Sequence, residues 1–223
     1  MQVTYLDHMG SDLSVVNAAR VSFKKKSELH YYCRPGAFEG KYSLKTKDAK
    51  LLSYLASHKH ELPFAHPHVQ IHVKAPIFVA RQLAKHQVGF VWSEVSRRYV
   101  TEIPEFYEPN IWRKAAPDKK QGSLNEEVDD NTFILGMPDL YNSCLETYSY
   151  LLGHGVAPEQ ARMVLPQNMY TEWQWTGSLL GWARVYRLRA AEDAQAETRE
   201  IAEQIGEIMS GLFPVSWKVL TDG

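Results

Sequence analysis

Side chains that can bind ligands or transfer protons are concentrated between positions 58 and 99. Five of the nine histidines fall between His58 and His72, and the stretch ends in the run SEVSRRY at residues 93–99. A guanidinium group binds phosphate or carboxylate in a planar fork, while serine donates a hydrogen bond and glutamate accepts one. This cluster is therefore suited to a ligand that carries both an anionic group and a polar ring, as a nucleotide does.

A metal centre is the first alternative for the histidines. The zinc-protease pattern needs two histidines four residues apart on one helix, whereas His60 and His66 are six apart and Pro63 interrupts any helix between them. On a strand, His66, His68 and His72 would face one side. Because such a cluster without a matching carboxylate or cysteine more often makes hydrogen bonds than binds zinc, we predict no metal site. A zinc hydrolase remains a rival interpretation.

Arginine is frequent for a chain of nearly neutral charge. For any single arginine, a salt bridge to one of the 26 acidic residues is the simpler interpretation, but for the whole cluster ligand binding is equally well supported. Arg81 stands in a predicted helix among Val79, Ala80 and Leu83, so its charge is not on an obviously solvated face. The cluster consists of Arg81, Arg97, Arg98, Arg162, Arg184, Arg187 and Arg189.

Familiar catalytic motifs are missing from the sequence. It has no glycine-rich phosphate loop, no dinucleotide fingerprint and no Gly-x-Ser-x-Gly nucleophile motif. Cys33 lies in a tyrosine-rich loop and Cys144 on the apolar stripe of a predicted helix, so we assign both structural roles. Motifs alone therefore indicate a globular protein with a polar, anion-binding pocket.

Composition limits the class of protein. The 223 residues are 44% hydrophobic and 23% charged, which is typical of a soluble domain. A net charge of −1 argues against nucleic acid as a partner, and no apolar run approaches the ~20 residues of a membrane helix. The polar start of the chain shows no secretory leader, and the two cysteines suit a reducing compartment. We therefore expect a cytoplasmic protein with no membrane partner.

Hydrophobic periodicity predicts an α+β fold, because the strands are few and alternate irregularly with helices. Ser11 or Asp12 is expected to cap the first helix and Thr46 the second, and Pro214 to end the last. Residues 27–43 are predicted to be a loop, and residues 101–136 a long, variable excursion that contains a short helix. The predicted helices cover residues 11–23, 46–58, 77–86, 138–152, 158–164, 178–188 and 194–212, and the strands residues 2–6, 68–74 and 168–175. The strand at 68–74 is predicted to be half-buried, because apolar and polar residues alternate along it with a period of two.

Apolar stripes are expected to face the core in three of these helices. They consist of Leu13, Val16 and Ala19 in the first; Leu140, Cys144, Tyr148 and Leu151 in the helix at 138–152; and Ile201, Ile205 and Ile208 in the last.

Three blocks in a fixed order carry a specific resemblance. They are residues 18–23 (AARVSF); His60 with residues 73–82 (VKAPIFVARQ) and the region 85–99; and residues 161–166 (ARMVLP) with Tyr170-Thr171, Leu188-Arg189-Ala190, Ala194-Gln195 and Glu197. In this order and spacing the chain resembles the flavin-dependent thymidylate synthase (ThyX) family. The resemblance extends from about residue 12 to the last helix, apart from residues 101–136.

The chain departs from the family signature at three points. Lys85-His86-Gln87 stands where Arg-His-Arg is usual, so the second flanking charge is lost. The spacer before Glu94 is one residue longer than usual. Ser178 stands where the family often has asparagine. The resemblance therefore implies a divergent member of the family, with changes at positions that contact flavin.

The resemblance implies a single catalytic domain over residues 1–223, with a central twisted, mostly antiparallel sheet packed by helices. It implies reductive methylation of dUMP to dTMP, with 5,10-methylenetetrahydrofolate as carbon donor, reduced FAD as hydride donor and NADPH as reductant of the flavin. No cysteine nucleophile is used. It also implies a homotetramer whose active sites are shared between subunits.

The resemblance assigns roles to individual residues. It implies catalytic roles for Ser96, Arg189 and His60. It implies dUMP contacts for Gln82, Glu94, Ser96, Arg97, Arg98, Arg162 and Arg189, and FAD contacts for Ser22, His60, Lys85, His86, Gln87, Glu94, Ser178 and Arg184. Two alternatives stay open: a divergent nucleotide- or flavin-binding homologue with weak or no synthase activity, and a non-catalytic nucleotide- or RNA-binding module.

Overall fold

A four-stranded sheet forms the centre of the protein, in a computed structural model that describes residues 1–32, 41–117, 122–129 and 132–222. Every neighbouring pair of strands is antiparallel, in the order β1, β4, β8, β5. The α+β class with an antiparallel central sheet is therefore confirmed. The strands are β1 (Gln2–Met9), β4 (His68–Pro76), β8 (Tyr170–Ser178) and β5 (Phe90–Glu94).

Alternation along β4 gives the sheet one buried face. Val69, Ile71, Val73 and Ala75 are fully buried, while the residues between them are partly exposed. This is the period of two that predicted a half-buried strand. The buried side chains of β8 on the same face include two tryptophans, Trp173 and Trp175.

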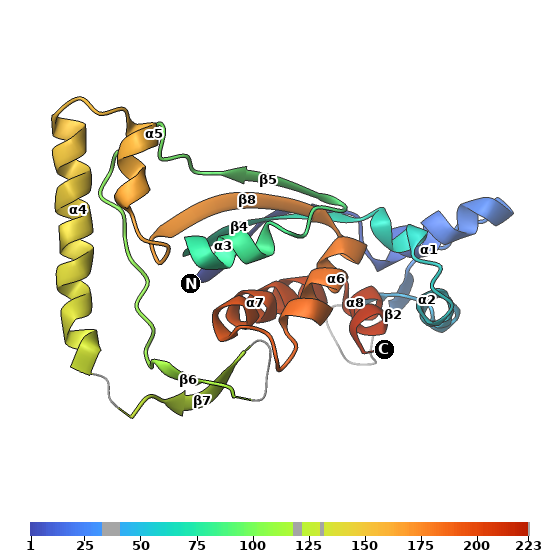
Figure 1. The fold of residues 1–223 in the computed structure, drawn as a ribbon. Coiled ribbons are helices and arrows are strands. Elements are labelled where there is room, and N and C mark those ends of the chain that lie inside the picture. Colours follow the sequence, from blue (N-terminus) through green and yellow to red (C-terminus); the bar gives the residue numbers. More distant parts are fainter. Residues whose placement is uncertain (33–40, 118–121, 130–131, 223) are drawn as a thin grey trace.

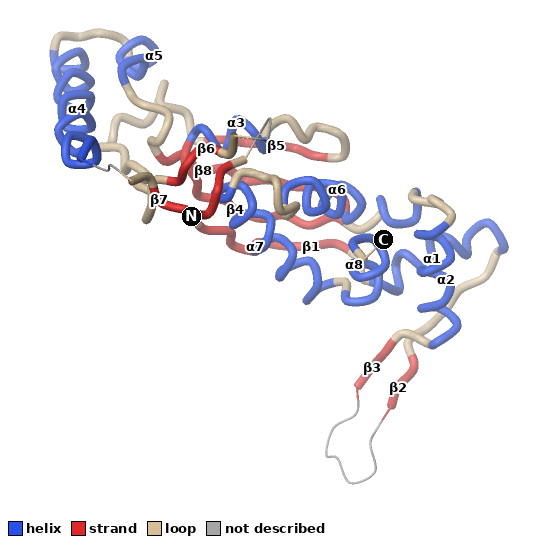
Figure 2. Tube along the Cα trace, turned by 60° about the horizontal axis from the view of Figure 1, so that its bottom comes forward, coloured by secondary structure: helices blue, strands red, loops and turns tan. Residues whose placement is uncertain are grey.

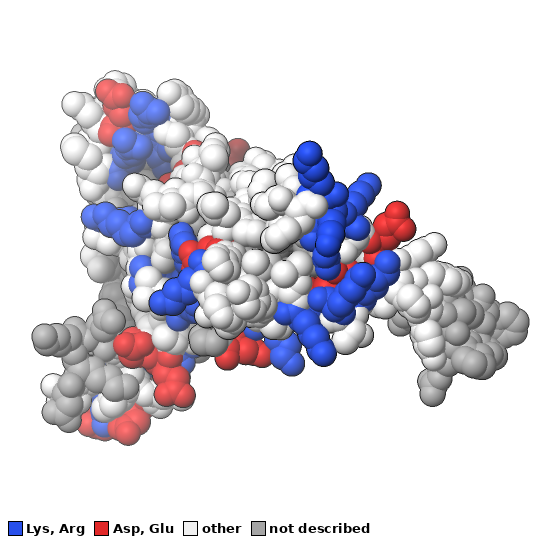
Figure 3. Space-filling view, turned by 90° about the vertical axis from the view of Figure 1, so that its right-hand side faces the viewer, with Lys and Arg blue, Asp and Glu red and all other residues white. Residues whose placement is uncertain are grey.

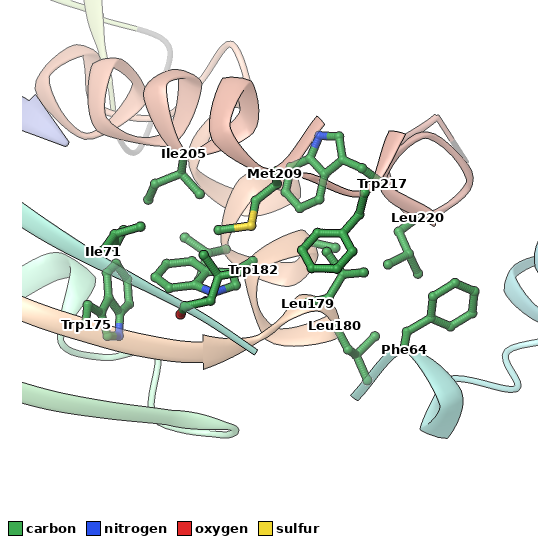
Figure 4. Packing of buried hydrophobic residues seen from close by; sticks show 14 of the residues in the cluster. Phe64, Ile71, Trp175, Leu179, Leu180, Trp182, Ile205, Met209, Trp217 and Leu220 are labelled. Carbon is green, nitrogen blue, oxygen red and sulfur yellow. The ribbon is translucent and has the colours of Figure 1, made fainter. Parts of the chain in front are cut away.

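Three helices cover this buried face (Figure 1): α6 (Leu179–Arg189), α7 (Ala196–Leu212) and α8 (Pro214–Thr221). Figure 4 shows Ile71 and Trp175 of the sheet, Trp182 of α6, and Ile205 and Met209 of α7 pointing into one shared core. All five side chains are buried. The inward stripe predicted for α7 is therefore confirmed at Ile205.

Helix α8 was not predicted, because Pro214 was interpreted as the end of the preceding helix. Instead Pro214 is the first residue of α8, a position where its missing N–H costs nothing. The backbone N–H groups of Val215 and Ser216 donate to the carboxylate of Asp12, at 3.0 and 2.8 Å. The helix therefore depends on a cap from the other end of the chain.

Helices α1 (Asp12–Arg20) and α2 (Thr46–Ser57) lie at one end of the sheet (Figure 1). Ser11 is the N-cap of α1, as predicted. The prediction that Thr46 caps α2 was wrong: the N-cap is Lys45, and Thr46 is the first residue of the helix. The predicted loop at 27–43 contains a short hairpin instead, which projects from the body (Figure 2) and is formed by β2 (His30–Tyr32) and β3 (Lys41–Ser43). Cys33 lies outside the described residues.

Helices α4 (Met137–Gly153) and α5 (Pro158–Ala161) lie at the opposite end (Figure 1), followed by a 3₁₀ helix (Arg162–Val164). The predicted helices are confirmed, but the buried stripe of α4 is shifted. Tyr141 is buried, whereas Leu140 is 51% exposed. Cys144 is half-buried on this helix.

The excursion at 101–136 is more ordered than predicted. It contains an antiparallel hairpin of β6 (Arg113–Ala115) and β7 (Ser123–Glu127), which was not predicted, and the short helix expected there is a 3₁₀ helix (Thr132–Gly136). Helix α3 (Ile77–Leu83) directly follows β4, with Pro76 at its N-cap. No helix among the described residues combines the length and the apolar character needed to cross a membrane.

Two glycines admit the first side chain of β5 into the core. The ring of Phe90 packs between Trp175 and Trp182, at centroid distances of 4.9 and 4.7 Å. A methyl group on Gly177 would lie 2.1 Å from this ring, and one on Gly181 would lie 2.9 Å from it. The position of β5 therefore depends on these two residues having no side chain.

We expect Gly177→Ala to lower the free energy of unfolding by about 1–3 kcal/mol, since the methyl group overpacks the core. The measurement is the midpoint of chemical denaturation. Gly153→Ala is the matched control, because nothing lies within 4 Å of the added methyl group there. Equal midpoints for the two variants would contradict the packing role of Gly177.

Candidate functional site

Most of the site residues predicted from the sequence fall into four groups in one chain. We name the first three the α1–α2 cavity, the Gln82–Arg189 cavity and the β5 exit; the fourth group is Arg162 alone. The α1–α2 cavity lies at one end of the sheet, and Arg162 follows α5 at the other end (Figure 1).

The α1–α2 cavity has a volume of about 800 Å³, a size that suits a cofactor or a large substrate. Its wall includes two predicted flavin contacts, Ser22 and His60. Most of the remaining wall is apolar. The apolar lining residues are Ala18, Ala19, Phe23, Leu51, Leu55, Leu62 and Pro63.

A partly buried ion pair fixes one wall of the α1–α2 cavity. Arg20 lines the cavity and donates from Nη2 to Oδ1 of the fully buried Asp48, at 2.5 Å. The hydroxyl of Ser27 donates to the same carboxylate oxygen at 3.0 Å. The segment that carries Ser22 is therefore bound to α2 on both sides.

The turn after α2 places His60. Lys59 has a positive φ of 56°, the left-handed conformation that glycine usually adopts at the end of a helix. The N–H of His60 then bonds the carbonyl of Leu55 at 2.8 Å, and the N–H of Lys59 bonds that of Ala56 at 3.1 Å. A non-glycine residue in this conformation stores strain, as residues at ligand sites often do.

A second ion pair connects this cavity to α6. Arg184, a predicted flavin contact, pairs with Glu61 of the cavity wall at 2.5 Å. Both side chains are partly solvent-exposed, so the pair can exchange partners when a ligand binds. The structure therefore places Arg184 beside the cavity that Ser22 and His60 line.

The end of the molecule that carries this cavity is basic. Lys and Arg side chains predominate over Asp and Glu on this face (Figure 3). In the sequence, the exposed residues Lys24, Lys25 and Lys26 directly follow the cavity-lining Phe23. A positive surface of this kind attracts the anionic part of a ligand.

The Gln82–Arg189 cavity has a volume of about 400 Å³ and a lining of both polar and apolar residues. Gln82 comes from α3 and Arg189 from the last turn of α6. Arg113 and Ser123 of the excursion also line it. Neither was predicted from the sequence, because the resemblance did not cover residues 101–136.

Hydrogen bonds fix the two predicted residues of this cavity. The Oε1 of Gln82 accepts a hydrogen bond from the hydroxyl of Thr198. Arg189 donates from Nε to Nε2 of His86 at 2.9 Å. Burial and, to a smaller extent, the charge of Arg189 lower the pKa of His86, and burial lowers the pKa of Arg189. His86 is therefore a neutral acceptor whose proton resides on Nδ1.

The three residues of the Lys85-His86-Gln87 triplet differ in their exposure to solvent. His86 faces inward to Arg189, whereas Lys85 and Gln87 are exposed. Ser178 is buried, and its hydroxyl caps α6 by accepting from the N–H of Gly181 at 3.2 Å. The flavin contacts assigned to these four residues stay predictions. Arg81, which was expected to avoid solvent, is exposed.

The β5 exit brings Glu94, Ser96, Arg97 and Arg98 together where the strand ends. Glu94 accepts hydrogen bonds from the hydroxyl of Thr171 at 2.8 Å and the indole N–H of Trp92 at 3.1 Å.

Ser96 and the two arginines form a turn. The Oγ of Ser96 accepts from the backbone N–H of Arg98 at 3.4 Å and from its Nε at 3.3 Å. Arg97 donates to the carbonyl of Glu102. The turn therefore offers two guanidinium groups and a hydroxyl, a set of donors that fits a phosphate.

Arg162 is separate from all the other predicted contacts. It is the exposed first residue of the 3₁₀ helix after α5 and donates from Nε to the carbonyl of Glu159 at 3.3 Å. The separation of this helix from the α1–α2 cavity along the sheet is visible in Figure 1. A single chain therefore does not bring all the predicted residues together.

The three histidines of the rival zinc interpretation, His66, His68 and His72, have different surroundings. His66 lines the α1–α2 cavity, the Nδ1 of His68 lies 3.0 Å from the carbonyl oxygen of His66, and His72 lies 3.2 Å from the carboxylate of Glu172. Within the described part of the chain, no group of three or more His, Cys, Asp or Glu side chains could hold a metal ion.

Comparison with known families identifies what the chain is similar to. A family model described as "Thymidylate synthase complementing protein" matches residues 4–215. A flavin-dependent thymidylate synthase of Thermus thermophilus is 39% identical over 215 residues, which cover 96% of this chain and 73% of the relative. A flavin-dependent thymidylate synthase of Thermosipho africanus is 38% identical over 215 residues, which cover 94% of this chain and 86% of the relative.

A solved structure shares the fold over nearly the whole chain. It is a UMP/dUMP methylase, PolB from Streptomyces cacaoi, bound with 5-Br dUMP. The TM-score is 0.81 at 28% sequence identity, and the match covers 99% of this chain and 94% of that one.

The neutral state of His86 predicts a pH dependence. Because its folded pKa lies below the ordinary value of 6.5, the unfolded chain binds a proton at higher pH than the folded chain does. The contribution of His86 to stability is therefore complete above pH 6.5 and declines as the pH falls from 6.5 toward the folded pKa.

An NMR titration with labelled histidine checks this, with His86→Gln identifying the signal. We expect a midpoint below 6.5 that Arg189→Gln raises only in part, since burial is the larger cause of the shift. A midpoint at or above 6.5 in the unaltered protein would contradict the neutral acceptor.

Proposed function

The chain belongs to the thymidylate synthase complementing protein family of flavin-dependent thymidylate synthases, and from that membership we propose that it converts dUMP to dTMP by reductive methylation. The observation that carries this proposal is the family match over residues 4–215, together with 39% identity to a named synthase. In the proposed reaction 5,10-methylenetetrahydrofolate supplies the carbon and NADPH re-reduces the flavin.

We assign the β5 exit and the Gln82–Arg189 cavity to different parts of the nucleotide. Arg97 and Arg98 offer charged donors for the phosphate, and Ser96 offers a hydroxyl. In the Gln82–Arg189 cavity, Gln82 offers an amide, and Arg189 forms no ion pair with the described residues. A half-buried guanidinium that forms no ion pair stabilises negative charge developing on a pyrimidine carbonyl oxygen, which favours bond formation at C5.

The α1–α2 cavity fits a flavin in size and in chemistry. It combines apolar walls for a planar ring with the histidine and serine that the resemblance assigned to FAD. When bound, FAD would supply hydride transfer. The residues of this chain would orient it: His60 by stacking or hydrogen bonding, Ser22 through its hydroxyl, and Arg184 by donating to its polar groups.

We further propose a homotetramer with active sites shared between subunits. Arg162, which is assigned to dUMP, and the α1–α2 cavity, which is assigned to FAD, lie at opposite ends of the sheet. Within a single chain, residues that would serve the same reaction are therefore far apart. Exposed apolar side chains also surround the cavity: Phe23 is 74% exposed and Leu62 is 81% exposed. A neighbouring subunit would cover these side chains and complete the site.

Residues 1–223 are proposed to form one catalytic domain, supported by a single hydrophobic core that joins side chains from Val15 to Leu220. Its proposed location is the cytoplasm, where thiols stay reduced.

One observation favours the second candidate, a homologue that binds flavin weakly. Lys85 and Gln87 are exposed, so neither is held by the fold in a geometry for ligand binding. Gln87 also offers no charge where the family has arginine.

We expect the purified protein to release tritium from C5-labelled dUMP only when methylenetetrahydrofolate, FAD and NADPH are all present. Arg189→Gln should lower the rate by a factor of about 10²–10³, as the loss of an oxyanion-stabilising donor does. Arg187→Gln on the exposed side of the same helix turn is the control and should stay active. A colourless protein that remains inactive with excess FAD would overturn the proposed function.

The departures from the family signature give a second test. The double variant Lys85→Arg/Gln87→Arg should bind FAD about tenfold more tightly, because each arginine adds charge-assisted hydrogen bonds. Equilibrium dialysis of FAD measures this, and the exposed Lys218→Arg on α8 is the control. An unchanged dissociation constant would contradict a flavin contact at these positions.

A further inference from the structure

We propose that hairpin β6–β7 of the excursion forms a wall of the nucleotide site and that Arg113 contacts the bound nucleotide, with Glu197 as the residue that positions it. Nothing in the family signature assigned a role to this segment. In naming the ligand as a pyrimidine nucleotide we rely on the proposed function.

The hairpin shares a cavity with the predicted nucleotide contacts. Arg113 of β6 and Gly122 and Ser123 at the start of β7 line the same cavity as Gln82 and Arg189. These lining residues come from three separate segments of the chain. The excursion therefore closes a side of the cavity that α3 and α6 leave open.

The hairpin approaches the loop after α6 closely. Gly122 has a positive φ of 96°, and a methyl group built on it would lie 3.2 Å from the backbone oxygen of Asp193. Glycine adopts this conformation at little cost, whereas a side chain here would be strained and would require the backbone of Asp193 to shift by a few tenths of an ångström. The fit between hairpin and loop is therefore specified by the sequence.

The Arg113 side chain is held on two sides. Its Nη2 donates to Oε1 of Glu197 at 2.6 Å, and its Nε donates to the hydroxyl of Ser123 at 2.8 Å. Glu197 is 6% exposed and also accepts from Gln195 at 3.1 Å and from the hydroxyl of Tyr107 at 3.4 Å. Among the described residues, the Nη1 of Arg113 has no hydrogen-bond partner. One donor of a rigidly held guanidinium therefore stays available to a ligand.

The charge of Arg113 is balanced locally. Burial alone would raise the pKa of Glu197. The hydrogen bond from Arg113, a backbone hydrogen bond, the charge of Arg113 and the hydrogen bond from Gln195 together outweigh burial, so that the pKa is lowered. Burial, followed by the charge of Glu197, raises the pKa of Tyr107 to about 12. Near neutral pH the carboxylate is therefore ionised and the phenol is not.

The resulting group has no net charge but presents N–H donors. Such a group fits a neutral acceptor, such as a carbonyl of the pyrimidine ring or a sugar hydroxyl, better than it fits a phosphate. This agrees with the assignment of the phosphate to the β5 exit. The ligand class for this wall is thus the nucleoside part of the nucleotide.

The next residue provides a matched control. Lys114 follows Arg113 on β6 but pairs with Asp129 at 2.7 Å and does not line the cavity. Replacing it removes one positive charge from the same hairpin without touching the proposed contact.

The test is equilibrium dialysis of labelled dUMP against the full chain, with tritium release measured in parallel. Arg113→Gln alone leaves the buried Glu197 unpaired and can unfold the protein, so the decisive variant is Arg113→Gln/Glu197→Gln, which removes both charges. We expect the double variant to unfold at a temperature close to that of the unaltered protein and to bind dUMP about tenfold more weakly. Lys114→Gln should bind dUMP normally.

Gly122→Ala tests the wall without altering any donor. It should raise the KM for dUMP severalfold, because the added methyl group forces the hairpin away from Asp193. Gly136→Ala in the same excursion is its control, since nothing lies within 4 Å of that methyl group.

The outcomes separate this proposal from the proposed function. Unchanged dUMP binding in a folded double variant would overturn the role of Arg113, even if the unaltered protein is an active synthase. Tritium release that is absent in the unaltered protein would overturn the proposed function instead, and weakened dUMP binding in the double variant would still support the wall.

Discussion

The antiparallel pairing of β4 with β8 is the constraint on which the site depends. The two strands are paired along their whole length, from His68 opposite Ser178 to Pro76 opposite Tyr170, and each runs directly into a helix. Helices α3 and α6 therefore begin at opposite ends of the same strand pair. Their C-terminal ends meet, where Arg189 bonds His86. The backbone pairing thus fixes the distance between residues that are 103 positions apart.

This pairing is stabilised by an unusually aromatic buried face. Trp173 and Trp175 alternate on β8, Trp92 of β5 stacks on Trp173 at 4.4 Å, and Phe90 fills the space above Gly177. Because aromatic rings bury large areas and pack in few geometries, they fix the register of the short strand β5. That register sets where Glu94 and the turn after it lie. Core packing and the proposed phosphate contacts are therefore coupled through β5.

Local sequence patterns predicted the elements whose signals are local. The alternation in β4 and the apolar stripes of α1 and α7 predicted those elements to within a few residues. Strand β5 was missed because it has only five residues and depends on glycines of β8 and α6 for its packing. Helix α8 was missed because its cap, Asp12, comes from 203 residues away. For the site, the resemblance identified the family correctly, but it did not cover residues 101–136 and so could not assign a role to Arg113. Local patterns could not do so either, because the partner of Arg113, Glu197, is 84 positions distant.

In the Lys85-His86-Gln87 triplet, the fold constrains the central histidine but not the two residues beside it. His86 is half-buried and bonded to Arg189, so its identity affects the chain's own structure. Lys85 and Gln87 are exposed on either side of it, and their side chains have no hydrogen-bond partner among the described residues, so changing them costs the folded chain little. The outer two residues can therefore vary without loss of the fold, whereas the central histidine is bonded to Arg189 in the wall of the Gln82–Arg189 cavity. Divergence at Lys85 and Gln87 therefore alters the surface and leaves the hydrogen bonds of Gln82 and Arg189 intact.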